Sequence, residues 1–414
     1  MRNVVVRWVV AGCCALACGA MTACGDDASD EVDAGRNDGG GAGADGGAPP
    51  RDAGRMDSGA AGSGALDAAP DDAAPADDDA GEDEDSGTGG DDTHVFRPEQ
   101  RAYSDELRAR LELPQGFSIK AFAEELQNPR MLAVSDDGTV YVTRPMQGDV
   151  LLLRDSDDDG RADVRMPAIA SLPGVHGIAL HEGMVYLATV KQVQRAAIAA
   201  DGTFGAPAVI VDGLPDGGQH PNRTLRVGPD RKLYISVGSS CDACAETNPE
   251  HATIVQTELD GSGRRVFARG LRNTIGFDAH PDTEELWGSD HGSDFRGDDL
   301  PPDEIDRIVD GSDYGWPYCF GDREVDPVIM DPPGTTKAEY CAMTVPAAFE
   351  YAAHSAPIGF VFYDGSQFPA EYRGDASSRS GVRGTASRPP GTKSCESTSR
   401  RAHRRRSNRS CPGS

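Results

Sequence analysis

The stretch Leu225-Arg-Val-Gly-Pro-Asp-Arg-Lys-Leu-Tyr-Ile-Ser236 decides the fold of this chain. Two runs of alternating apolar and polar residues flank a Gly-Pro-Asp turn, and a period of two around a tight turn is typical of a β-hairpin. The same phrase occurs at 132–143 and 178–189, with a looser copy at 275–287. Successive copies start 46, 47 and 50 residues apart, without a helical pattern between them. Hairpins at this spacing predict a β-propeller with four strands per blade.

A fifth copy begins at 358–363, which is 83 residues after the start of the fourth. A long insertion is therefore expected between the fourth and fifth copies of the phrase. Beyond Asp375 the apolar alternation stops, and the chain becomes rich in Arg, Ser, Gly and Pro. Five visible blades before such a tail predict an all-β, six-bladed propeller whose last strands are incomplete in this chain.

Composition divides the 414 residues, whose formal net charge is -28, into segments of different character. Residues 25–93 hold 21 acidic residues against 3 Arg, among Gly, Ala, Ser and Pro, and are expected to form a disordered tether. Residues 94–376 hold 46 acidic and 25 basic residues. Phosphate contacts need a basic face, so this acidity excludes a nucleic-acid binder. The 283 residues of this segment can bury a large core and are expected to hold the propeller and its chemistry.

Residues 1–24 have the pattern of an export signal. Arg2 and Arg7 accompany an apolar stretch, 8–23, that is too short to span a membrane comfortably. Met21-Thr-Ala-Cys24 resembles a bacterial lipobox, which makes Cys24 the expected lipidation site. An ordinary signal peptide cut nearby is the alternative. We expect an exported protein anchored by lipid to the cell envelope, at the outer membrane or the periplasmic face.

Several short phrases occur in a fixed order across residues 111–376. They are Leu113-Pro-x-Gly-Phe-x-Ile, Asn128-Pro-Arg, His220-Pro-Asn-Arg, Gly270-Leu-Arg-Asn and Asp303-Glu-Ile-Asp with Asp313-Tyr-Gly-Trp-Pro. Together they resemble the soluble quinoprotein sugar dehydrogenases, a group that includes glucose, aldose-sugar and sorbosone dehydrogenases. The resemblance implies a six-bladed propeller that binds pyrroloquinoline quinone and calcium. It also implies oxidation of a sugar or sugar aldehyde, with the electrons passed to an external acceptor.

The basic tail, 377–414, holds 10 basic residues against one Glu. A genuine basic arm is one interpretation. The other is a frameshift near Ala376. Read one base earlier, the codons of 377–386 can encode Phe-Val-Ala-Leu-Arg-Gly-Ser-Trp-Asn-Arg, and those of 390–397 can encode Thr-Gly-Tyr-Lys-Val-Val-Arg-Val. Both phrases resemble the last blades of the quinoprotein family, so we hypothesise that the tail is out of frame.

The resemblance assigns roles to several polar residues. His220 matches the general base that takes the proton of the sugar hydroxyl, a task suited to imidazole. Ser239 stands where the glucose-oxidising branch has an Asp that orients this base. Arg272 and Asn273 match the pair that contacts the quinone, and a guanidinium can stabilise charge on a quinone oxygen. The family's Gln nearby is Ile275 here. A turn-capping His and a structural channel Arg are the alternatives.

Two further predictions concern the cofactor. Gly292 and Ser293 match the turn whose backbone carbonyls hold the cofactor calcium in this family, and calcium there would polarise the quinone carbonyl. His176 opens the second repeat and is expected at the same channel mouth, where it would contact substrate or cofactor.

A second calcium site is predicted without any family. Asp155, Asp157, Asp159 and Asp163 occupy positions 1, 3, 5 and 9 of an EF-hand-like loop, with Gly at position 6. Position 12 is Met rather than Glu, and no helices flank the loop. We therefore expect a calcium clip in a hairpin loop, with a solvated acidic turn as the alternative.

Four cysteines lie in the propeller segment. After export, disulfides are the default, and the expected pairs are Cys241 with Cys244 and Cys319 with Cys341. A zinc site made from all four is the alternative.

The predicted function is therefore calcium- and pyrroloquinoline quinone-dependent oxidation of a sugar or sugar aldehyde. The chain as written lacks the Lys and Arg residues of the last blades that hold the cofactor's carboxylates in this family, and an open ring exposes strand edges. We expect this polypeptide to bind the cofactor poorly and to be inactive or weakly active. The alternative function is a non-catalytic, extracytoplasmic propeller that binds a glycan or a protein partner.

Overall fold

The computed structural model describes residues 5–6, 104–216 and 218–380. The expected lipidation site Cys24, the acidic segment 25–93 and the basic tail beyond 380 lie outside these residues. The helices among the described residues are short: α1 (Asp105–Ala109), α2 (Lys337–Cys341) and the 3-10 helix η1 (Ala370–Tyr372). None of them has the length and apolarity needed to cross a bilayer. The described chain is an all-β protein.

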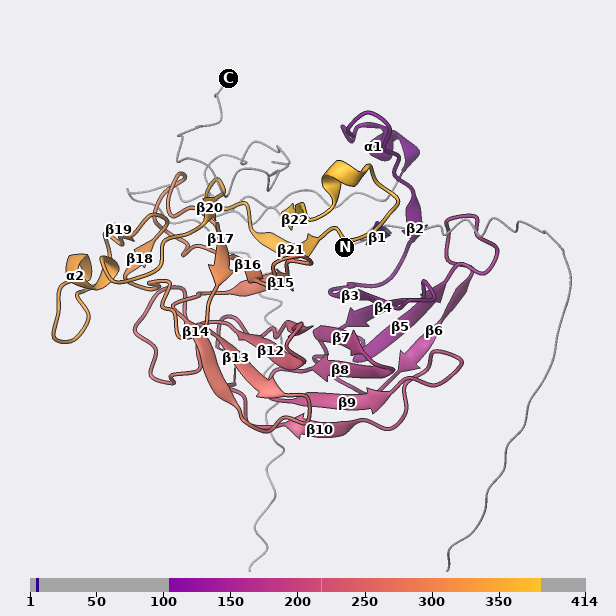
Figure 1. Cartoon of the computed structure of the whole chain (residues 1–414), viewed down its shortest axis with the longest axis horizontal. Helices are drawn as coiled ribbons and strands as arrows, with labels where there is room; N and C mark the ends of the chain where they lie inside the picture. The colour runs from indigo at the N-terminus through magenta and orange to yellow at the C-terminus, as the bar shows by residue number, and fades with distance from the viewer. Residues whose placement is uncertain (1–4, 7–103, 217, 381–414) are drawn as a thin grey trace, which may run out of the picture. The chain divides into compact units, whose positions relative to one another are not determined.

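Four antiparallel, four-stranded sheets follow one another along the chain (Figure 1). The first contains β3 (Leu132–Val134), β4 (Val140–Arg144), β5 (Asp149–Arg154) and β6 (Val164–Ile169). The second contains β7 (Gly177–His181), β8 (Met184–Ala188), β9 (Val193–Ala197) and β10 (Ala208–Val211). The third contains β11 (Leu225–Val227), β12 (Lys232–Val237), β13 (Thr253–Glu258) and β14 (Arg265–Arg269). The fourth contains β15 (Thr274–Ala279), β16 (Leu286–Asp290), β17 (Glu304–Ile308) and β20 (Phe349–Glu350).

These sheets form four blades of a propeller-like arrangement, and each begins with one of the predicted hairpins. In the hairpin that opens the third sheet, Leu225 pairs with Ile235 and Val227 with Leu233. The first strands lie together: β3 contacts β7, β7 contacts β11, and β15 contacts the first strand of a fifth sheet, β21 (Pro357–Phe362). Loops that lead into these first strands are therefore brought close to one another.

The apolar core lies between successive blades. This explains why central strands such as β12 bury residues of both alternating sets. One cluster of buried apolar side chains fills each interface between neighbouring sheets. From the first interface to the fourth, representative pairs are Leu152 with Leu187, Val193 with Ile235, Ile254 with Phe277, and Ile305 with Phe360.

The fifth sheet has two antiparallel strands, β21 and β22 (Ala376–Ser380). Phe362 pairs with Ala376 at one end of the sheet, and Pro357 pairs with Ser380 at the other. β22 thus runs four residues past the predicted end of the propeller segment. A short pair, β1 (Val5–Val6) with β2 (Ala121–Ala123), completes the described strands outside the insertion.

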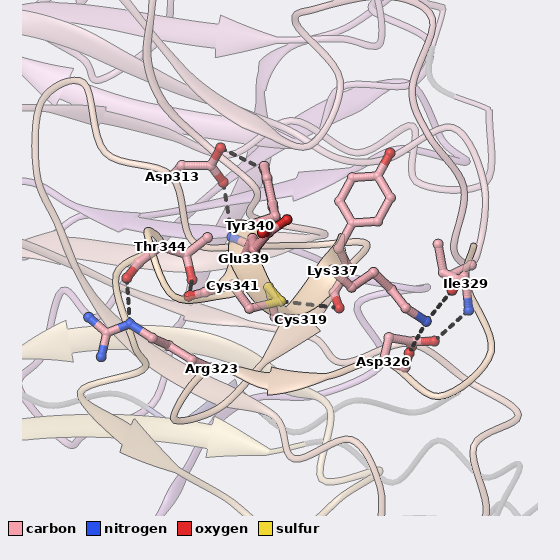
Figure 2. The surroundings of a disulfide bond; sticks show 12 residues. Asp313, Cys319, Arg323, Asp326, Ile329, Lys337, Glu339, Tyr340, Cys341 and Thr344 are labelled. Carbon is pink, nitrogen blue, oxygen red and sulfur yellow. Dashed lines mark hydrogen bonds between the residues drawn. A yellow bond between two sulfur atoms is a disulfide. The ribbon is translucent and has the colours of Figure 1, made fainter. Parts of the chain in front are cut away.

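The insertion between β17 and β20 contains β18 (Cys319–Phe320), β19 (Glu324–Val325) and α2. Figure 2 shows that the Cys319–Cys341 disulfide joins β18 to α2, while Tyr340 Oη donates to Asp313 Oδ2 at 2.7 Å. The hairpin pattern did not predict α2. Thr336 and Glu339 form a capping box at its start, a sequence signal that would have revealed this helix.

Candidate active site

The predicted catalytic and cofactor residues lie in loops that enter the first strands of three neighbouring blades. His176 directly precedes β7, His220 lies in the loop before β11, and Arg272 and Asn273 directly precede β15. All four side chains are buried, with at most 6% of their surface exposed. A Cβ at Gly238 would lie 2.5 Å from His220 Cβ and 3.0 Å from Asn273 Oδ1. Only glycine fits there, so the fold brings both His220 and the Asn273 amide against one residue.

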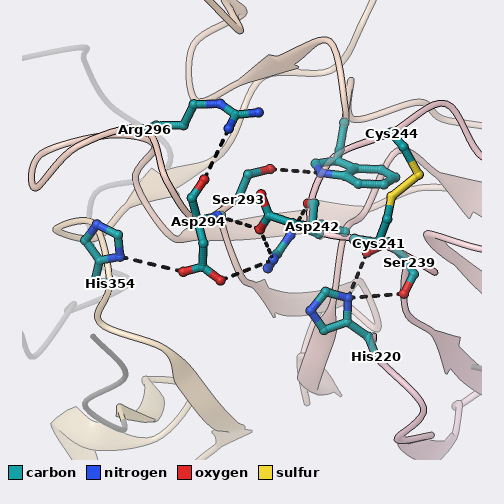
Figure 3. A network of polar contacts seen from close by, with 12 residues as sticks. His220, Ser239, Cys241, Asp242, Cys244, Ser293, Asp294, Arg296 and His354 are labelled. Carbon is teal, nitrogen blue, oxygen red and sulfur yellow. Dashed lines mark hydrogen bonds and ion pairs between the residues drawn. A yellow bond between two sulfur atoms is a disulfide. The ribbon is translucent and has the colours of Figure 1, made fainter. Parts of the chain in front are cut away.

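The hydrogen bonds of His220 define its tautomer. Nδ1 lies 2.8 Å from Ser239 Oγ and 3.2 Å from the Ser239 carbonyl oxygen (Figure 3). A carbonyl only accepts, so Nδ1 carries the proton and Nε2 keeps its lone pair. Ser239 therefore orients the ring from the position where an Asp was expected.

Arg223 anchors the loop that carries His220, a role that sequence reasoning missed. Its guanidinium is fully buried and donates to the carbonyl oxygens of His220 at 3.0 Å, Pro215 at 2.8 Å and Val190 at 3.1 Å. Burial lowers the pKa of Arg223 to about 10. The position of the backbone at His220 thus depends on one buried side chain.

His176 is connected to the same loop through Arg223. Its Nδ1 lies 3.0 Å from the Arg223 carbonyl oxygen and must donate to it. Burial lowers the pKa of His176 to about 3, so the ring is neutral. Within the described residues Nε2 has no hydrogen-bond partner, which leaves a buried lone pair able to accept from a ligand.

Arg272 is held by carboxylates on two sides. Its Nη2 lies 2.7 Å from Asp242 Oδ1 and 3.6 Å from Asp294 Oδ2, and its Nε donates to the Asp242 carbonyl oxygen at 2.8 Å. Asp294 also lies 3.9 Å from His354 Nδ1 (Figure 3). Asp294 follows the predicted calcium turn directly, whereas His354 comes from a distant loop with no sequence signal. These contacts fix the direction of the Arg272 guanidinium.

The turn predicted to hold calcium lies beside this arginine. Gly292 N–H donates to Asp303 Oδ1 at 2.8 Å, and Ser293 Oγ accepts from Trp316 Nε1 at 3.1 Å. A Cβ at Gly292 would meet the Pro302 carbonyl oxygen at 2.8 Å, so this backbone is tightly enclosed. Gly292, Ser293 and Trp316 line a small hollow together with the carboxylates Asp290, Glu304 and Asp326.

Those carboxylates form an unusual cluster. Asp290 accepts from the backbone N–H groups of Arg272 and Asn273 at 2.8 and 2.9 Å, and burial raises its pKa to about 6. Burial and the negative charges of Asp290 and other carboxylates raise the pKa of Glu304 to about 8. Asp306 is 1% exposed, and neither of its oxygens has a hydrogen-bond partner among the described residues. The pKa of Asp306 is raised well above its ordinary value, mainly by burial and to a smaller extent by the negative charge of Glu304.

This cluster makes stability depend on pH. At pH values between the ordinary carboxyl range and about 8, the folded protein binds more protons than the unfolded chain. The free energy of unfolding in calcium-free buffer therefore falls as pH rises through that window. We expect Asp306→Asn to stabilise more at pH 8 than at pH 5, with a difference of at least about 1.4 kcal/mol, the equivalent of one pKa unit.

Urea unfolding at both pH values measures this effect. The exposed carboxylate Asp310, which pairs with Arg265, provides the control variant Asp310→Asn, because its pKa is lowered rather than raised. An equal loss of stability at pH 5 and pH 8 for Asp306→Asn would contradict the expected linkage.

The acidic loop predicted from the EF-hand pattern lies elsewhere, between the outer strands β5 and β6 of the first blade. The carboxylate oxygens of Asp155, Asp157 and Asp159 lie within 4.8 Å of one another. Asp163 instead accepts from the Ser156 N–H at 2.7 Å and is not part of this group of three. The structure thus assembles three of the four predicted ligands and does not bring the loop to the active site.

The four propeller cysteines form two disulfides. Cys241 is joined to Cys244, and Cys319 to Cys341, with Cα–Cα distances of 6.2 and 5.8 Å. Sulfurs in disulfides are not thiolates, so these four residues do not form the alternative zinc site in this structure.

Comparison with known proteins places the chain among sugar dehydrogenases by sequence. The profile of the glucose/sorbosone dehydrogenase family matches residues 126–379. An uncharacterized protein of Borreliella burgdorferi is 26% identical over 284 residues, which cover 65% of this chain and 71% of the relative. The quinoprotein glucose dehydrogenase B of Acinetobacter calcoaceticus is 22% identical over 259 residues, or 51% of this chain. That match spans 54% of the Acinetobacter protein's own length.

Solved structures show the same fold. The holo form of the pyranose dehydrogenase PQQ domain from Coprinopsis cinerea superposes with a TM-score of 0.51 at 18% identity, covering 57% of this chain and 68% of that one. The calcium structure of a Trichoderma reesei protein of carbohydrate-active enzyme family AA12 has the same TM-score at 19% identity, covering 66% and 82%.

Proposed function

The chain belongs to the glucose/sorbosone dehydrogenase family, and we propose that it oxidises a sugar or sugar aldehyde with pyrroloquinoline quinone and calcium as cofactors. One observation carries the proposal: the buried imidazole of His220, whose Nδ1–H donates to Ser239, lies next to Asn273 and near Arg272, which is paired with Asp242. The removal of a proton and a hydride from a carbinol requires a base, an amide and a guanidinium group. The quinone of the Acinetobacter and Coprinopsis relatives supports the choice of cofactor.

Each residue has a defined task in this proposal. His220 Nε2 removes the hydroxyl proton, and Ser239 keeps the opposite nitrogen protonated so that Nε2 remains the basic atom. Arg272 and Asn273 hold the cofactor oxygens, and the fixed guanidinium stabilises negative charge there. His176 offers its unpaired Nε2 to a hydroxyl of the substrate or to the cofactor. When bound, the quinone supplies the two-electron acceptor.

The residues around Gly292 and Ser293 fit a divalent cation. The buried carboxylates Asp290, Asp303 and Glu304 lie around the turn, and Asp306, two residues after Glu304, has no hydrogen-bond partner among the described residues. Such a donor set suits calcium, which prefers oxygen ligands. We propose that the carbonyls of Gly292 and Ser293 hold the ion. It would act as a Lewis acid on the cofactor when bound.

The finer architecture is also a proposal. The two-stranded sheet β21–β22 supports a fifth blade that lacks outer strands, and a complete six-bladed ring would require the frame hypothesised for the tail. Two disulfides support export to an oxidising compartment. Lipid anchoring through Cys24 remains an expectation from its lipobox-like context.

A dye-reduction assay tests the function. Purified protein is loaded with pyrroloquinoline quinone and calcium, and reduction of an artificial electron acceptor is followed with a panel of aldoses and sugar aldehydes. We expect turnover that needs both cofactors, weak at most in the chain as written and stronger once the hypothesised reading frame after Ala376 is restored. Tight binding of a glycan without dye reduction, in a chain that is folded and loaded with cofactor, would favour the non-catalytic alternative.

The acidic loop provides a separate test of calcium binding. An ion bound only by the folded state at 100 times its dissociation constant adds about 2.7 kcal/mol, or roughly 5 °C in Tm. We expect calcium to raise the Tm of the cofactor-free protein. The variant Asp155→Asn/Asp157→Asn should lose a large part of that shift. Asp260→Asn, in another exposed Asp turn, serves as the control, and an undiminished shift in the double variant would rule out the clip.

A further inference from the structure

The loop that follows β12 contains the Cys241–Cys244 disulfide, which closes a ring of four residues. β12 ends at Val237 and β13 begins at Thr253, so this loop lies outside the strand pairing of its blade. Figure 3 shows two ring residues, Cys241 and Asp242, close to His220 and Asp294 respectively. The ring thus touches both halves of the candidate active site.

The first contact of the ring leads to His220. Ser239 Oγ lies 2.7 Å from the Cys241 carbonyl oxygen, and a carbonyl only accepts, so the hydroxyl must donate to it. The hydroxyl lone pairs are then left to accept from His220 Nδ1–H at 2.8 Å. The direction of the Ser239 hydroxyl therefore depends on where the ring holds one peptide carbonyl, and this hydroxyl acts together with the Ser239 carbonyl oxygen, 3.2 Å from Nδ1, in setting the tautomer of His220.

The second contact leads to Arg272. Asp242 lies within the ring and accepts from Arg272 twice: from Nη2 through Oδ1 at 2.7 Å and from Nε through its carbonyl oxygen at 2.8 Å. Asp294 N–H donates to the same Oδ1 at 2.7 Å, so the carboxylate is held from two sides. Arg272 is only 3% exposed, so displacing Asp242 would leave a buried cation without this partner.

We propose that the Cys241–Cys244 ring is a single positioning element that sets the tautomer of His220 and the direction of the Arg272 guanidinium together. The proposal rests on the function above only in naming these groups as base and cofactor contact. A disulfide across four residues restrains little of the unfolded chain, because its stabilisation grows with loop length. Opening the ring should therefore disturb the site much more than the fold.

The decisive experiment is nitrogen NMR of selectively labelled histidine and arginine side chains in the cofactor-free, full-length protein. The test variant is Cys241→Ser/Cys244→Ser, and the matched control is Cys319→Ser/Cys341→Ser in the insertion. His220 is assigned by the loss of its signals in His220→Ala. In the unmodified protein and in the control, we expect a protonated Nδ1, a bare Nε2 and an Arg272 Nε–H protected from exchange.

In the test variant we expect Nε2–H to become the major tautomer and the Arg272 Nε–H to lose its protection. In loaded enzyme the same change should lower kcat about 10- to 100-fold with little change in KM, because the reacting groups are misplaced rather than removed. A test variant that keeps both NMR signatures would overturn the proposal. If no protein is active, the proposed function fails, but the NMR result still decides the role of the ring.

Reduction of the native protein gives an independent route if the double variant does not fold. Cys241 and Cys244 are partly exposed, whereas Cys319 and Cys341 are buried, so a water-soluble phosphine should reach the ring first. The phosphine becomes a phosphine oxide with the oxygen of one water, and the disulfide becomes two thiols. Loss of both NMR signatures upon selective reduction supports the proposal, and their survival refutes it.

Discussion

Replacing His220 with Ala lowers kcat/KM of the loaded dehydrogenase by about 1,000-fold, while the affinity for the cofactor stays within a few-fold of the parent. The loss is this large because general-base catalysis contributes about 100- to 10,000-fold. His220 Nδ1–H donates to Ser239, which leaves Nε2 of the same ring as the basic nitrogen. Steady-state dye reduction and a cofactor titration by fluorescence measure the two quantities.

The matched control for this result is His181→Ala, which removes an imidazole from β7 at a position outside the site. The control should retain turnover close to the parent value. Equal activity of the parent and His220→Ala would remove His220 from the proposed chemistry. A ligand bound equally well by both, without any dye reduction, would favour the binding-module alternative.

Restoring the hypothesised reading frame after Ala376 strengthens cofactor binding at least 100-fold over the chain as written. The restored segment would supply outer strands for the fifth blade and the basic residues that the family resemblance assigns to the cofactor's carboxylates. Ion pairs with a bound carboxylate in a partly buried site contribute several kcal/mol when correctly placed, and 100-fold corresponds to about 2.7 kcal/mol. Isothermal titration of both proteins with pyrroloquinoline quinone measures the difference.

One local feature of β22 supports this second expectation. Ser378 lies in the half-buried set of the strand, and within the described residues its hydroxyl has no hydrogen-bond partner. The restored frame places Val at this position, where an apolar side chain leaves no unsatisfied hydroxyl. Resequencing the gene across the codons for Glu371–Glu396 provides the control at the level of DNA. Equal cofactor affinity of the two proteins would contradict the expectation.

The hairpins of the blades followed from local sequence. Alternation such as that of 225–236 specifies strand, turn and strand within about a dozen residues, and the structure pairs Leu225 with Ile235 as the turn requires. The repeat spacing then predicted successive blades, of which four are complete here. α2 was missed because the hairpin repeat says nothing about an insertion.

The residue types of the candidate site were also visible in the chain. The motifs around His220, Arg272 and Gly292 were recognisable, and the fold brings these loops together at the first strands of neighbouring blades. The supporting partners were not predictable in the same way. Arg223, Asp242 and His354 act through contacts with residues that are distant along the chain or with backbone carbonyls.

The sequence by itself determined the blade hairpins, the acidic character of the propeller segment and the family of this chain, because these depend on local order and composition. Only the tertiary structure decided that Ser239 orients His220 and that Asp242 and Asp294 balance Arg272. It also decided that Asp306 is buried with no hydrogen-bond partner among the residues that the structure describes. The physical reason is that tautomer, charge balance and desolvation arise from atoms that meet only when separate blades pack together.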